Sequence, residues 1–156
     1  MFNCNTSQLS NGLKMMCFSA CALTVSGCSP MTLEEQFRGI EVCSVTNVFL
    51  DPVTDKASGQ YFTDRKLQPC RIDEAAFYCV NDSFYGLTAT QIAIPYRGPF
   101  SVHALYFKEN PSTAETVLRV RFESLKLNQQ DAASPRLIEN PKQQGSSVFY
   151  CDEDSE

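Results

Sequence analysis

The chain has 156 residues, no tryptophan and a formal net charge of −5, and its basic residues are scattered along it. This length suits one domain, alone or with a processed leader. The acidic balance argues against nucleic acid as a partner, because a phosphate-binding surface needs clustered lysine and arginine. The chain also contains eight cysteines, which is many for a protein of this size in a reducing compartment.

An uncharged run covers residues 15–26 and follows directly after Lys14. The run is too short for a transmembrane helix, which needs about 20 apolar residues. A basic residue, a short apolar core and then small residues follow one another in secretory signal peptides. The alternative is a buried helix of the folded domain, which gives no reason for the small residues at the end of the run. We therefore expect residues 1–27 to be a leader.

The leader ends in the sequence Val-Ser-Gly-Cys at residues 25–28. This segment resembles the lipobox of bacterial lipoproteins, in which an aliphatic residue and two small residues precede a cysteine. The resemblance implies a diacylglyceryl group on the sulfur of Cys28, cleavage just before it, and acylation of the new amino group. Two or more acyl chains anchor a protein stably, whereas one binds only marginally. In Gram-negative lipoproteins, an aspartate directly after the lipidated cysteine commonly signals retention in the inner membrane. This chain has Ser29 at that position, which implies the outer membrane if the cell is Gram-negative.

Four cysteines remain for disulfides in the mature chain of residues 28–156, namely Cys43, Cys70, Cys79 and Cys151. An even number in an oxidising compartment predicts two bridges, and four cysteines allow three pairings. We favour Cys70 with Cys79, which closes a short loop, and Cys43 with Cys151, which ties the beginning of the domain to its end. The competing metal site lacks any C-x-x-C pair, so we expect no metal and no cofactor.

The first expected element of the mature domain is a helix that starts at Thr32. Thr32 and Glu35 form a capping box, and the apolar residues that follow share one helical face: Leu33, Phe37 and Ile40. Only three residues separate Cys28 from Thr32, a span of at most roughly 10 Å. We therefore expect the domain to sit directly on the membrane.

Five later segments are rich in β-branched and aromatic residues and predict strands: residues 42–50, 75–81, 84–95, 100–107 and 147–151. The second and third of these surround a predicted tight turn at residues 81–83. Strict alternation places Leu87, Ala89, Gln91 and Ala93 on one face of the third strand. In the fourth, alternation separates Phe100, Val102, Ala104 and Tyr106 from Ser101, His103, Leu105 and Phe107.

The segment over residues 110–125 fits either a strand or a helix. We favour the helix, because a capping box of Ser112 and Glu115 agrees with apolar residues at helical spacing. Residues 127–146 are polar with two prolines and a glycine, and predict a loop. The C-terminal tail is acidic. The predicted fold class is α+β: a small antiparallel sheet of four or five strands with two short helices, held together by disulfides.

Catalytic signatures are weak in this chain. Its single histidine, His103, has no G-x-S-x-G motif to accompany it, and it is interpreted as a partly exposed strand residue. The acidic pairs at residues 34–35 and 73–74 are interpreted as helix starts, where carboxylates favour the helix dipole. We therefore expect no catalytic residue.

Aromatic residues gather in the middle third of the chain and must mostly form the core, since tryptophan is absent. Two groups fall in predicted loops: Phe84 and Tyr85 beside the hairpin tip, and Tyr96 and Arg97 between two prolines. Exposed tyrosine and arginine are favoured interface anchors. We expect these four residues to form a binding edge.

The expected function is that of a membrane-anchored envelope lipoprotein that is not an enzyme. It would bind another envelope protein or an envelope polymer, in an assembly or maintenance role. Two alternatives stay open: an inhibitor of an attacking enzyme such as lysozyme, and an envelope hydrolase. An exposed aromatic patch would favour the binding lipoprotein. A protruding loop that blocks lysozyme would favour the inhibitor, and a deep pocket with carboxylates around His103 would favour the hydrolase.

Overall fold

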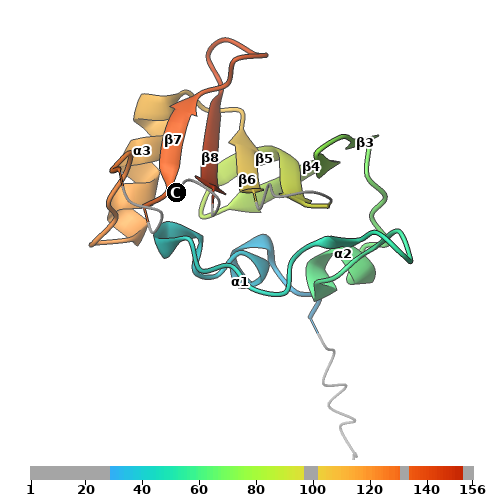
Figure 1. Ribbon diagram of the computed structural model, residues 1–156. Helices are drawn as coiled ribbons and strands as arrows, with labels where there is room; N and C mark the ends of the chain where they lie inside the picture. The colour runs from blue at the N-terminus through green and yellow to red at the C-terminus, as the bar shows by residue number, and fades with distance from the viewer. Residues whose placement is uncertain (1–28, 97–101, 131–133, 153–156) are drawn as a thin grey trace, which may run out of the picture.

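The computed structural model describes residues 29–96, 102–130 and 134–152 (Figure 1). Residues 1–28 with the leader and Cys28, residues 97–101 with Arg97, and the end of the acidic tail lie outside this part. The helices are α1 (Leu33–Gln36), α2 (Gln60–Asp64), α3 (Pro111–Arg121) and a 3₁₀ helix, η1 (Ile40–Val42). The strands are β1 (Leu50–Asp51), β2 (Lys56–Ala57), β3 (Arg71–Ile72), β4 (Ala75–Phe84), β5 (Leu87–Pro95), β6 (Val102–Phe107), β7 (Arg136–Glu139) and β8 (Ser147–Asp152).

The fold is α+β, as predicted, and its main sheet is antiparallel. Six strands follow one another across it in the order β3-β4-β5-β6-β8-β7, while β1 and β2 pair separately. The sheet is larger than the four or five strands expected. Its two edge strands, β3 and β7, were not predicted. β7 lies within residues 127–146, where the prolines and the glycine predicted only a loop.

The main hydrophobic core lies against one face of this sheet. Residues from the three α-helices and η1 join the strands in it, including Leu33, Ile40, Phe62 and Leu118. We call residues 29–68, with α1, η1, α2, β1 and β2, the helix layer; Figure 1 shows α1 and α2 beneath the sheet. A second, smaller cluster on the opposite face of the sheet is made only of strand residues.

The N-terminal segment of the helix layer departs from the predicted strand over residues 42–50. Only Leu50 belongs to a strand, because the backbone of Cys43 and Asn47 has positive φ values of 50° and 58°. Such a backbone cannot be extended. The β-branched Val45 and Val48 instead turn inward and are buried. Propensity for strands is thus overridden by packing.

The β4–β5 hairpin turns at Tyr85–Gly86, so the predicted turn at residues 81–83 is wrong. Both turn residues have positive φ, 50° and 91°, as a two-residue type I′ turn requires. Residues 81–83 lie inside β4, whose pairing with β5 shifts register between Cys79 and Asp82. The polar residues at 81–83 therefore lie at or next to a β-bulge in β4, and not in a turn.

A second register shift, between Ala89 and Gln91 in the β5–β6 pairing, changes which side chains of β5 share a face. Leu87 and Ala89 join the main core, but Ala93 belongs to the cluster on the opposite face. A bulge inserts one extra residue, and strict alternation fails beyond it. The predicted common face of these residues is therefore wrong after Ala89.

Helix α3 confirms the helical interpretation of residues 110–125, with a different cap. The side chain of Asn110 accepts a hydrogen bond from the Thr113 N–H at 2.9 Å, and Pro111 follows in the first turn. Proline is favoured there because its missing N–H has no partner inside the helix. The predicted Ser112 capping box is not the N-terminal cap. By contrast, the Thr32–Glu35 box of α1 forms as predicted.

The structure contains two disulfides, in the pairing that the sequence favoured. Cys43–Cys151 joins the helix layer to β8 across 108 positions, and Cys151 is buried. Cys70–Cys79 closes a short, exposed loop beside β4. Two disulfides indicate an oxidising, extracytoplasmic compartment. Within the part of the chain described, no helix has the length and apolar character to cross a membrane.

The free edge of β7 is occupied by the side chain of Asn128. Its Oδ1 accepts from the Leu137 N–H at 3.0 Å and its Nδ2 donates to the Leu137 carbonyl at 3.3 Å. The amide thus takes the place of a neighbouring strand. Exposed edges invite pairing with other chains, so we expect this contact to hinder self-association through β7.

We expect Asn128→Ala to destabilise the domain by about 1–2 kcal/mol, because it leaves the Leu137 backbone groups unpaired, and to promote self-association through β7. Urea unfolding and sedimentation measure the two effects. Asn140→Ala is the matched control, because the side-chain oxygen of Asn140 accepts from the Lys142 N–H within a local turn and pairs with no strand backbone. Equal behaviour of the two variants would show that the edge needs no such cap.

Candidate functional site

The three described residues of the predicted binding edge, Phe84, Tyr85 and Tyr96, do not lie together. Phe84 is 0% exposed and stacks on Phe107 in the core, so no partner reaches it. Tyr85 is half-buried, with its ring 5.3 Å from that of Phe122. Tyr96 packs partly buried against the core, and Arg97 lies outside the described residues.

The geometry of β5 separates the two predicted loops. Tyr85 precedes β5 and Tyr96 follows it, and the strand has nine residues, a length of roughly 30 Å. The two tyrosines therefore stand at opposite ends of one strand. The structure does not join them into one edge.

His103 is a core residue, and the expectation of partial exposure is wrong. Its side chain is 4% exposed, and Nε2 lies 2.9 Å from the carbonyl oxygen of Val48. The ring also meets the edge of Phe37, with centroids 6.4 Å apart. His103 thus links β6 to the buried segment before β1, which is a structural role.

The surface with the most distinctive chemistry is the side of the main sheet turned away from the core. We call it the outer face and define it by the residues of the second cluster: Ala75, Phe77, Ala93, Val102, Ala104, Tyr106, Val148 and Tyr150. Ala93, Ala104 and Val148 form a buried floor, and the others around them are half-buried. Aromatic side chains on two sides therefore enclose a floor of small residues.

Cross-strand register explains this arrangement. Phe77 pairs with Ala93, Ala93 with Ala104, and Ala104 with Tyr150, so one row runs across four strands. Side chains directly opposite in an antiparallel pair lie about 5 Å apart. Alanine has low strand propensity, and two alanines in central strands leave room between the rings.

A hollow of about 190 Å³ opens on this face, lined by Asp73, Glu74, Ala75, Phe77, Ala93, Val102 and Tyr106. The ring centroids of Phe77 and Tyr106 are 6.3 Å apart. Asp73 and Glu74 form its acidic rim, in the connection between β3 and β4, so the prediction that they start a helix is wrong. The hollow combines aromatic walls with negative charge at one side.

Arg71 fixes one wall of the hollow. Its guanidinium lies 3.5 Å from the centroid of the Phe77 ring and 3.1 Å from the Asp73 carboxylate. Burial raises the pKa of the Tyr106 hydroxyl, against a smaller lowering by the positive charge of Arg71. Tyr106 therefore stays protonated at neutral pH and keeps a hydroxyl that can donate a hydrogen bond.

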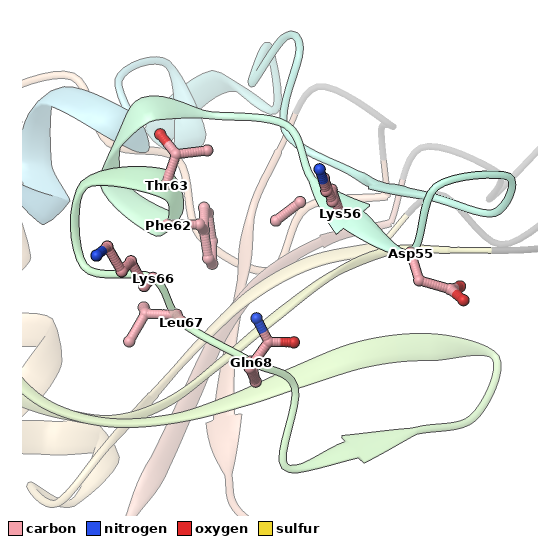
Figure 2. Close-up of a pocket in the computed structure, with 8 residues that line it drawn as sticks. Asp55, Lys56, Phe62, Thr63, Lys66, Leu67 and Gln68 are labelled. Carbon is pink, nitrogen blue, oxygen red and sulfur yellow. The ribbon is translucent and has the colours of Figure 1, made fainter.

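A separate cavity of about 340 Å³ lies in the helix layer between β2 and α2 (Figure 2). Ala57, Phe62 and Leu67 supply apolar walls. Figure 2 shows Lys56 and Lys66 on opposite sides of it, and neither lysine is ion-paired with a residue that the structure describes. The lining thus combines apolar walls with the two lysines and the acidic Asp55.

The described segments hold no group of three or more side chains suited to bind a metal ion. Comparison of the chain with protein-family models, with curated proteins and with solved structures found no match. Sequence reasoning missed the outer face as a site, although it placed Val102, Ala104 and Tyr106 together on one side of their strand. The sequence signal that could have indicated this face is the pair Ala93 and Ala104, two small residues in strands that otherwise have bulky side chains.

Proposed function

We propose that this protein is a non-enzymatic lipoprotein of the bacterial cell envelope, anchored through Cys28, and that it binds a protein partner with its outer face. The observation that carries the proposal is the aromatic enclosure of Phe77, Tyr106 and Tyr150 around a small-residue floor. The two disulfides support an extracytoplasmic location. The lipobox resemblance at residues 25–28 supports the anchor.

The size of the hollow favours a protein over a small molecule. Small-molecule pockets have volumes of about 300–1,000 Å³, and the hollow on the outer face has about 190 Å³. It is suited to one projecting side chain of a larger partner. Tyrosine and arginine around such a hollow are the residue types that carry most of the binding energy at interfaces.

The charge of the chain favours a partner with a basic surface. The formal net charge is −5, and Asp73 and Glu74 line the hollow itself. Complementary charge steers association and selects partners. An inhibitor of an attacking enzyme such as lysozyme is the narrower form of this proposal, because it too binds a protein.

The experiment places a photo-crosslinking amino acid at Tyr106 in cells, with Val120 on α3 as the control position. Val120 is 81% exposed, so it reports non-specific contacts. We expect one discrete crosslinked protein from position 106 and none from position 120. Equal crosslinking from both positions would contradict the proposal.

The second step measures affinity for the crosslinked protein once it is purified, and for lysozyme in parallel. Tyr106→Ser should weaken binding at least about tenfold, while Val120→Ser leaves it unchanged and both variants stay folded. Unchanged affinity of Tyr106→Ser would remove the outer face from the interface. Inhibition of lysozyme in a turbidity assay would identify the narrower function.

A further inference from the structure

The way in which the chain enters the domain fixes the helix layer close to the proposed anchor. The Met31 N–H donates to Asp64 at 3.3 Å, and Arg65 Nη1 donates to the Met31 carbonyl at 2.8 Å. Met31 is therefore fastened to the end of α2 and to the residue after it. Only Ser29 and Pro30 lie between Cys28 and Met31, so the two residues are at most roughly 10 Å apart.

The side of the helix layer that faces away from the sheet is the one on which the chain arrives. Figure 1 shows the chain at residues 29–32 entering from beneath α1 and α2. It also shows the connection from η1 to β1 running along this same underside. An anchor at Cys28 thus brings this connection to the membrane before any part of the sheet.

The chain from η1 to the β1–β2 turn exposes large apolar side chains. Val42 is 53%, Phe49 42% and Val53 88% exposed; these are three of the six large hydrophobic residues that are exposed in the described segments. The Val53 N–H donates to the Asp51 carboxylate at 2.7 Å, so the turn holds Val53 in place. Exposed apolar residues close to a membrane anchor can insert into the lipid interface.

We propose that the helix layer docks on the phospholipid surface, with Phe49 and Val53 in the headgroup region. The inference rests on the proposed function, because it needs the acyl chains on Cys28. This layer, residues 29–68, contains six acidic and four basic residues, so docking relies on apolar contact and does not require anionic lipid. The sheet then lies above the helix layer, and its outer face points away from the membrane toward a partner.

The absence of tryptophan from the chain makes a direct test possible. Phe49→Trp and Val53→Trp each introduce a single tryptophan, and Val120→Trp is the matched control for Val53→Trp because both valines are more than four-fifths exposed. The acylated proteins are reconstituted in phosphatidylcholine vesicles with and without brominated acyl chains. We expect a blue-shifted emission and quenching by brominated lipid at positions 49 and 53, and neither at position 120.

A flexible linker gives a second, independent measurement. About 20 Gly/Ser residues after Pro30 add a mean reach of roughly 25 Å, and should reduce the quenching at positions 49 and 53. Intact mass of the same preparations reports acylation. A chain without acyl groups overturns the proposed function together with this inference. An acylated chain with equal quenching at positions 53 and 120 overturns the docking orientation alone.

Discussion

Replacing Cys43 and Cys151 together with alanine should lower the free energy of unfolding by about 5 kcal/mol, because their disulfide closes the longer loop. The bridge joins residues 108 positions apart, and Cys151 is 1% exposed. Without it, the helix layer is held to β8 only by non-covalent contacts. Since domains of this size have a total stability of about 5–15 kcal/mol, the variant should be partly unfolded at physiological temperature.

Replacing Cys70 and Cys79 with alanine is the matched control for this effect. Their disulfide spans nine positions, for which loop entropy gives about 2.5 kcal/mol. Urea unfolding of both variants and of the parent measures the difference. A larger loss from the short bridge than from the long one would contradict the structural role given to Cys43–Cys151.

Cys28→Ser should abolish the acylation of the protein. Without a sulfur at residue 28 there is no site for the diacylglyceryl group, and neither acylation nor lipoprotein cleavage follows. Stable anchoring needs two acyl chains, because a single chain binds only marginally. The loss of acyl label is therefore expected to be complete. The label is the decisive readout, because the leader of this variant stays uncleaved.

Cys21→Ser is the control, because Cys21 lies in the same apolar run but outside the proposed lipobox at residues 25–28. Membrane fractionation, with metabolic labelling by a fatty-acid analogue, separates the outcomes. We expect label on the parent and on Cys21→Ser, and none on Cys28→Ser. Label that persists in Cys28→Ser would place the acyl chains on a different residue.

Elements that depend on nearby residues were predicted well. The capping box of Thr32 and Glu35 and the helix over Pro111–Arg121 follow from contacts within a few positions. Alternation in β6 also holds, because no bulge interrupts its pairing with β8. The disulfide pairing is the one predicted, in which one bridge closes a short loop and the other joins the beginning of the domain to its end.

Elements that depend on distant residues were not predicted. The hairpin turn needs Tyr85 at positive φ, which is rare for a bulky residue. The carboxylate of Glu34, 51 positions away, accepts the Tyr85 N–H at 2.8 Å and supports this conformation. Likewise β7 is completed by the side chain of Asn128, a contact that no local pattern in residues 127–146 reveals.

The same reasoning explains the missed site. Phe84 was predicted to belong to a binding edge because it lies beside a predicted loop, but the hairpin buries it. The outer face is assembled by cross-strand register, and the bulge after Ala89 decides that Ala93 belongs to it. Register between strands depends on bulges and turns, and the turn in this chain was misplaced.

The intact mass of the protein extracted from membranes, before and after reduction, tests the central claim most directly. An exported and lipid-anchored domain gives a chain that begins at Cys28, carries the added mass of its acyl groups, and gains four hydrogens when its two disulfides are reduced. A chain that still contains residues 1–27, with no acyl mass and with free thiols, would contradict both the anchor and the compartment.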